Sequence, residues 1–160
     1  MTGAASPRRA FFSASLGAAA GLLLARRAEA TDYATAREAL DAMETQAAEV
    51  VARLRALCGV PGARVFCERL LVAHERQRSE RGRLRGRLGL PAAAPAPPAQ
   101  VDRSLAGLRA AQEALVFAQA EGLPALPDGR AVDLIAHQLV VSARQLTLVD
   151  LWIEGEQARA

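Results

Sequence analysis

The chain has 160 residues, about half of them hydrophobic, and a formal net charge of +3. This length suits one domain with a single core and is short for two. Residues 1–30 hold four arginines and one glutamate, so the rest of the chain carries equal numbers of basic and acidic side chains. A neutral body lacks the excess positive charge that phosphate backbones require, and we expect no nucleic-acid partner.

Residues 1–30 have the organisation of an export signal. A short apolar run at 14–25 is followed by Ala28-Glu29-Ala30, which has the small-x-small form of a cleavage site. The run is shorter than the roughly 20 apolar residues of a transmembrane helix, so no stable membrane span is expected after cleavage. The mature chain would begin near Thr31.

The arginine pair within this segment points to one export route. Arg8 and Arg9 precede Phe11 in Ser6-Pro7-Arg8-Arg9-Ala10-Phe11-Phe12, which resembles the twin-arginine (Tat) signal. The resemblance implies a bacterial protein that folds before export and ends in the periplasm or is secreted. An ordinary secretory signal and an uncleaved anchor are the alternatives.

Residues 32–58 predict a first helix, because apolar side chains recur there at steps of three and four. These side chains are Leu40, Met43, Ala47, Val50, Leu54 and Leu57. Gly59 and the Val60-Pro61-Gly62 turn end this helix, so a second helix is expected to run back antiparallel to it.

Cys58 and Cys67 flank this turn. In an exported protein such a pair predicts a disulfide, here one that staples a helical hairpin. Closing so small a loop would stabilise the fold by about 2–3 kcal/mol. The alternative is two buried thiols in the hairpin core.

The second helix contains a long stretch without apolar side chains, at residues 74–83. Continuing the apolar seam of Cys67 and Leu70 places His74, Gln77 and Arg81 on the inner face. Since buried polar groups need hydrogen bonds, we expect either a polar layer of His74 and Gln77 with Gln112 of the third helix, or a binding site.

The same helix is rich in arginine. One hypothesis is a basic patch for an anionic partner, made by Arg76, Arg78, Arg81, Arg83, Arg85 and Arg87. The alternative is a solvated helix end whose arginines pair with acidic residues of neighbouring helices.

Residues 89–100 form a proline-rich linker. In polyproline geometry it would reach roughly 30–37 Å, comparable to the length of a helix of twenty-odd residues. If it crosses the bundle, the second and third helices run parallel, and if it loops back, the bundle is up-down-up-down. A third helix is expected from residue 101 or 102 to 121.

Residues 129–156 predict the fourth helix, with two apolar stripes. The first, expected to face the bundle, contains Val132, Ile135, Leu139, Ser142, Leu146, Val149 and Ile153. The second contains Leu134, Val141, Leu148 and Trp152. An exposed apolar stripe usually marks an interface, so this one predicts a homodimer or an exported protein partner.

Two helical hairpins joined by a long connection resemble the ferritin-like superfamily. Its di-metal members carry Glu-x-x-His on the second and fourth helices, where this chain has Leu71-Val72-Ala73-His74 and Leu134-Ile135-Ala136-His137. Leucine replaces the bridging glutamate both times. The resemblance implies an all-α four-helix bundle over residues 31–160. Its metal ligands would be Glu44, His74, Glu113 and His137, but without both bridging carboxylates we expect no iron or manganese centre.

The sequence therefore predicts an exported, non-catalytic helical bundle that acts by self-association or partner binding. The alternative function is a metal-binding or small-ligand-binding bundle, with redox activity as one variant, built on a polar interior around His74.

Overall fold

The computed structural model describes residues 35–95 and 101–158. The predicted export signal, including Arg8, Arg9 and Phe11, lies outside these residues. The described segments form four α-helices and one short 3-10 helix, with no strand among them. None of these helices is long and apolar enough to cross a membrane.

Helices α2 (Ala36–Leu57) and α3 (Arg64–Arg87) form the first hairpin. A reciprocal cap starts α2, because the Glu38 backbone N–H donates to Thr35 Oγ1 at 3.2 Å and the Thr35 N–H donates to Glu38 Oε2 at 3.1 Å. Gly62 in the connecting turn has φ 81° and Gly89 after α3 has φ 67°, a conformation that glycine adopts without strain.

Helices α4 (Leu105–Gly122) and α5 (Gly129–Gln157) form the second hairpin, joined through the 3-10 helix η2 (Leu123–Ala125). The predicted start of α4 was three or four residues too early. Asp102 accepts hydrogen bonds from the Ser104 N–H and hydroxyl, which fixes a turn before the helix. Ser104 then caps α4 by accepting from the Gly107 N–H.

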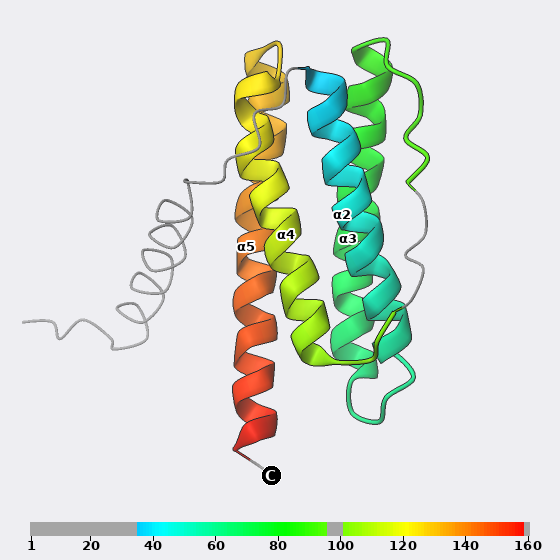
Figure 1. The fold of residues 1–160 in the computed structure, drawn as a ribbon, viewed down its shortest axis with the longest axis vertical. Coiled ribbons are helices and arrows are strands. Elements are labelled where there is room, and N and C mark those ends of the chain that lie inside the picture. Colours follow the sequence, from blue (N-terminus) through cyan, green and yellow to red (C-terminus); the bar gives the residue numbers. More distant parts are fainter. Residues whose placement is uncertain (1–34, 96–100, 159–160) are drawn as a thin grey trace, which may run out of the picture. The chain divides into compact units, whose positions relative to one another are not determined.

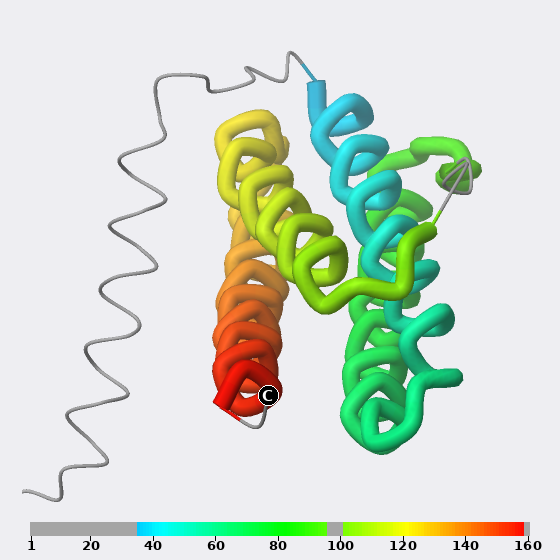
Figure 2. Tube along the Cα trace, turned by 60° about the horizontal axis from the view of Figure 1, so that its bottom comes forward, coloured from blue at the N-terminus to red at the C-terminus, as the bar shows by residue number. Residues whose placement is uncertain are grey.

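The linker joins opposite ends of the bundle. Helix α3 ends where α2 begins, whereas α4 begins at the far end, so α3 and α4 run parallel (Figure 1). The crossing connection is thus the one that the structure adopts, rather than up-down-up-down. Helix α2 packs against both α3 and α4, and α5 packs chiefly against α4 (Figure 2). The predicted all-α four-helix bundle of two hairpins is confirmed.

Two apolar clusters lie toward opposite ends of the bundle. One, near the α2–α3 turn, includes Val50, Leu54, Cys67, Leu108 and Leu115. The other, near the α4–α5 turn, includes Leu40, Met43, Leu84, Ala118 and Ile135. The buried polar side chains other than Arg85, here called the polar layer, come from all four helices and lie chiefly between these clusters: Glu44, His74, Gln77, Arg81, Gln112, Gln119, Gln138, Ser142 and Gln145.

Helix α5 is rotated relative to the predicted stripe. Its buried positions are Ala131, Ile135, Gln138, Ser142, Gln145 and Val149. Val132, Leu139 and Leu146 of the predicted inner stripe are partly buried instead. The inner face of α5 therefore carries glutamines where leucines were expected, because α5 turns these glutamines toward polar partners on α3 and α4.

Candidate functional site

A buried ion pair forms the centre of the polar layer. Arg81 Nε donates to Glu44 Oε1 at 2.8 Å, and both side chains are almost fully buried. Arg81 Nη1 also donates to Gln138 Oε1 at 3.0 Å, which links α3 to α5. Removing either charge would leave the other buried and unpaired, which strongly destabilises a folded protein.

Glutamine amides extend this network to α4 and α5. Gln138 Nε2 donates to the backbone carbonyl of Gln77 and to Glu80 Oε2, each at 3.1 Å. Burial of Glu80 opposes its ionisation, but its hydrogen bonds with Gln138 and Arg76 outweigh this effect and lower its pKa. Gln112 Nε2 donates to the Ser142 carbonyl at 3.1 Å and to Gln145 Oε1 at 3.3 Å.

His74 is one of several side chains in this layer that lack hydrogen-bond partners among the described residues, along with the amides of Gln77 and Gln119. Its side chain is 1% exposed, yet neither ring nitrogen has a partner in hydrogen-bonding geometry among the described residues. Burial, together with the charge of Arg81, lowers the pKa of His74 to about 4, and Gln112 opposes this change. The imidazole is therefore neutral near pH 7 and offers one N–H donor and one nitrogen acceptor.

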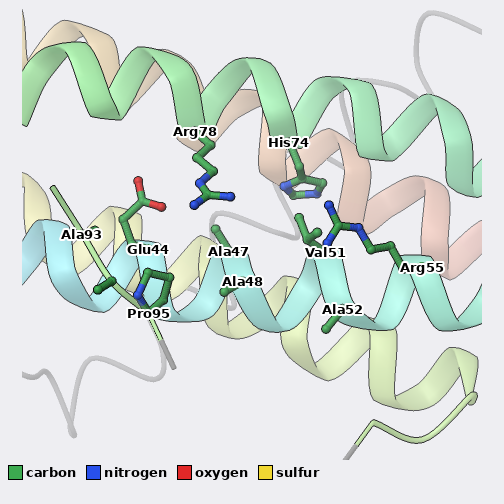
Figure 3. Close-up of a pocket in the computed structure, with 11 residues that line it drawn as sticks. Glu44, Ala47, Ala48, Val51, Ala52, Arg55, His74, Arg78, Ala93 and Pro95 are labelled. Atoms are coloured by element: carbon green, nitrogen blue, oxygen red, sulfur yellow. The ribbon is translucent and has the colours of Figure 1, made fainter. Parts of the chain in front are cut away.

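A cavity of about 330 Å³ lies beside His74, between α2, α3 and the linker. We call it the linker cavity. Figure 3 shows His74 and Arg78 entering this space from α3, with Glu44 and Arg55 entering it from α2. Its lining residues are Glu44, Ala47, Ala48, Val51, Ala52, Arg55, His74, Arg78, Ala93, Ala94 and Pro95.

Arg85 holds the linker over the groove between α2 and α3. Its Nε donates to the Pro91 carbonyl at 2.8 Å, and its Nη1 lies 2.7 Å from Asp41 Oδ1 of α2. Leu88 and Leu90 pack against the apolar cluster at this end. A second cavity of about 310 Å³ follows the same groove and shares Glu44, Arg78 and Ala93 with the linker cavity.

The four candidate metal ligands do not converge. Glu44 and His74 both line the linker cavity, but Glu44 is bound to Arg81. Glu113 accepts a hydrogen bond from Arg109 at 3.1 Å, and His137 is exposed on α5. No group of three or more His, Cys, Asp or Glu side chains suited to a metal ion occurs within the described part of the chain.

The six arginines proposed as one basic patch are not on one surface. Arg81 and Arg85 are buried in ion pairs with Glu44 and Asp41. Arg76 pairs with Glu80 and Arg87 with Asp128, whereas Arg78 lines the linker cavity and Arg83 lines a separate cavity against α5. Helical periodicity turns neighbouring arginines to different sides, so the six-residue patch is wrong as a single surface.

Cys58 and Cys67 are free thiols in the structure. Cys67 is buried beside Leu54 and Leu70 in the same apolar cluster, with Cys58 partly buried against it. Burial and the neighbouring Cys58 raise the pKa of Cys67 to about 12. The disulfide stays a prediction.

The predicted interface stripe of α5 is divided. Trp152 packs within the bundle, with its ring centroid 4.6 Å from that of Phe66 on α3, and Leu134 packs against the cluster near the α4–α5 turn. Val141 is partly buried and Leu148 is 48% exposed. The exposed apolar face of α5 consists of Val140, Leu148 and Leu151.

Sequence reasoning overlooked several residues of the site. Gln138 and Gln145 were not singled out, although each follows a buried residue of α5 by three positions and so lies on the inner face. The linker residues Ala93, Ala94 and Pro95 were interpreted as a spacer only. Nothing in their sequence indicates what they cover, since that depends on where Arg85 places the linker.

Comparison with known proteins gave no relative. No protein-family model, no curated protein and no solved structure matches the chain significantly.

Proposed function

We propose that this protein is a helical-bundle binding protein that takes a small molecule in the linker cavity. The observation that carries the proposal is the imidazole of His74, whose ring nitrogens are buried without a partner among the described residues. The amides of Gln77 and Gln119 share this property, but of the three side chains His74 alone lines the linker cavity. Buried polar groups in native proteins are nearly always hydrogen-bonded, and each exception calls for a reason. A ligand that accepts from or donates to His74 supplies that reason.

The surroundings of His74 support ligand binding rather than a purely structural role. Its neighbours Glu44 and Arg81 are joined to each other at 2.8 Å and do not satisfy the imidazole. Alanines on α2 and in the linker leave the space beside it open. A concave, mainly apolar pocket with a few converging polar groups is the usual form of a small-molecule site.

Filling the cavity tests this function. We expect a screen of fragments of about ten heavy atoms, by saturation-transfer NMR, to yield hits that Ala48→Phe abolishes, because Ala48 lines the cavity. The matched control is Ala110→Phe at an exposed position of α4, which should retain every hit. Hits that survive Ala48→Phe, or an absence of hits, would refute the proposal.

A second candidate function is self-association through α5. Val140, Leu148 and Leu151 lie on one side of this helix and are all exposed, with Leu151 53% accessible. A twofold pairing of α5 with its copy would bury these side chains in both protomers, since such an interface is self-complementary. In this pairing Leu148 lies at the centre of the interface, whereas Trp152 stays packed within the bundle.

Export by the twin-arginine route and a ferritin-like ancestry are also proposals. The Arg8-Arg9-Ala10-Phe11 motif supports the first, and two hairpins with parallel α3 and α4 support the second. Replacing Arg8 and Arg9 by lysine should retain precursor in the cytoplasm, as measured by fractionation and immunoblotting. Normal export of the double mutant would instead indicate the general secretory route.

A further inference from the structure

Two arginines line the linker cavity without a carboxylate partner. Arg55 comes from α2 and Arg78 from α3, and both reach into the space beside His74 (Figure 3). Neither makes an ion pair with another residue in the described ranges. Arg69 of α3 likewise makes no ion pair there, but it lies outside this cavity. The cavity therefore brings together two free guanidinium groups from different helices.

The cavity's acid does not neutralise these arginines. Glu44 is the single carboxylate among the lining residues, and its Oε1 accepts from the buried Arg81 at 2.8 Å. With Glu44 and Arg81 balancing each other and His74 neutral, two positive charges remain at the wall. Such a wall favours an anionic ligand, and planar guanidinium groups match the geometry of a carboxylate.

The rest of the wall is apolar. Ala47, Ala48, Val51 and Ala52 of α2 face Ala93 and Pro95 of the linker. At about 30 Å³ for each water-sized group, the 330 Å³ cavity holds roughly ten heavy atoms. An anion that fills it would thus combine one charged group with a short hydrocarbon body.

An inorganic phosphate fits this wall less well. Phosphate sites commonly use the free backbone N–H groups at a helix N-terminus. Here the cavity is lined by the middle of α2 and α3, whose backbone N–H groups are already bonded within the helices. Side chains are the donors that remain, namely Arg55, Arg78 and His74.

We propose that the linker cavity binds a small organic monocarboxylate, with Arg78 and Arg55 holding the carboxylate and the alanine-rich wall holding the hydrocarbon body. This inference rests on the proposed function and names the ligand class of the same site. His74 would donate or accept one further hydrogen bond. Linker residues 93–95, which follow the Pro91 carbonyl bound by Arg85, would lie beside the bound molecule.

Isothermal titration calorimetry of the full chain with matched acids and amides tests the ligand class. Benzoate and hexanoate are compared with benzamide and hexanamide, which keep the shape and remove the charge. We expect at least one acid to bind with a Kd of about 1 mM or tighter and its amide to bind about tenfold more weakly. Arg78→Gln should raise the Kd of the acid by about tenfold. Arg69→Gln, on the same helix but outside the cavity, should leave that Kd unchanged.

The outcomes separate this inference from the proposed function. If the amides bind as tightly as the acids and Ala48→Phe abolishes both, the cavity binds small molecules but the carboxylate assignment is wrong. Inorganic phosphate that binds as tightly as the acids would overturn the organic assignment. If neither acid binds but fragments do, the assignment also fails. If no probe and no fragment binds, both proposals fail. Ala52→Leu serves as a second filling variant should Ala48→Phe not fold.

Discussion

At the residue scale, His74 is one of the side chains at which the polar layer costs stability. A buried imidazole without a hydrogen bond loses its contacts with water and receives no direct replacement from the protein. Arg81 adds to this cost for the charged form, because its guanidinium repels a proton on the ring. The native fold therefore keeps His74 neutral, and the surrounding packing must offset the loss of solvation.

We predict that His74 makes the fold sensitive to mild acid. Its pKa falls from 6.5 in the unfolded chain to about 4 in the native structure, so the unfolded state binds the proton more readily. The free energy of unfolding should thus decrease as the pH falls from about 6.5 to about 4, by at most about 3 kcal/mol. Urea unfolding of wild type and His74→Leu at several pH values measures this contribution as a difference.

The control for this prediction is His137→Leu, because His137 is exposed on α5. The free energy of unfolding of His137→Leu should depend on pH as that of the wild type does. His74→Leu should remain folded and show a weaker pH dependence of this free energy. Equal pH profiles for wild type and His74→Leu would show that the imidazole is not neutralised by burial.

We also predict that Cys58 and Cys67 form an intramolecular disulfide once the protein reaches an oxidising compartment. Cys58 packs against the apolar cluster that contains Cys67, and the bond would stabilise the fold by about 2–3 kcal/mol. Denatured, non-reduced protein from the exported fraction should show no titratable thiol with a chromogenic disulfide reagent. Two titratable thiols would mean that the pair serves as ordinary core.

At the element scale, the packing of α2 against α4 is close at Gly122. A methyl group at Gly122 would collide with Met43 Cε and lie 3.2 Å from Ala39 Cβ. Helices packed this closely cannot accept a larger side chain without a shift of one helix or of the methionine.

Gly122→Ala should therefore destabilise the protein by about 1–2 kcal/mol, because overpacking outweighs the gain in helix propensity. Thermal or urea unfolding gives the measurement. Gly155→Ala on α5 is the control, since a methyl group there meets no atom within 4 Å. That variant should gain about 0.5–1 kcal/mol, and a similar gain in Gly122→Ala would contradict the close α2–α4 packing.

Periodicity in the sequence was sufficient to predict the helices and much of their inner faces. All six predicted seam residues of α2 are buried, as are His74, Gln77 and Arg81 on α3. Periodicity predicted the inner face of α5 less reliably, because apolar side chains surround much of this helix. Two candidate seams there differ by a small rotation, and only partners such as Arg81 and Gln112 determine which one faces inward.

The site itself was only partly predictable. A run of polar residues on an otherwise apolar seam correctly indicated a polar interior around His74. The cavity was not foreseeable, because it depends on the course of the linker, and the length of the linker allowed either connection. Arg85 illustrates the difficulty: its sequence neighbours suggested a surface charge, whereas it is buried between Asp41 and the Pro91 carbonyl.

At the scale of the whole molecule, the exposed apolar face of α5 is the surface on which the self-association candidate rests. We predict that the purified protein sediments as a dimer and that Leu148→Glu converts it to a folded monomer, because two carboxylates, one from each copy, cannot be buried in an apolar interface. Analytical ultracentrifugation measures the mass, and circular dichroism checks the fold.

Val72→Glu is the control for surface charge, since Val72 is 68% exposed on α3. It should leave the dimer intact. A wild type that sediments as a monomer, or a Leu148→Glu variant that unfolds, would end the self-association candidate.

The lining of the linker cavity comes wholly from residues 44–95. Under the proposed function, the first half of the chain would make the ligand contacts, whereas α4 and α5 of the second half lie outside the cavity wall. Substitutions in the first half can alter ligand preference while the contacts made by the second half stay the same. In descendants of this chain, the first hairpin and linker would be free to diverge toward new ligands, with the second hairpin inherited as a constant scaffold.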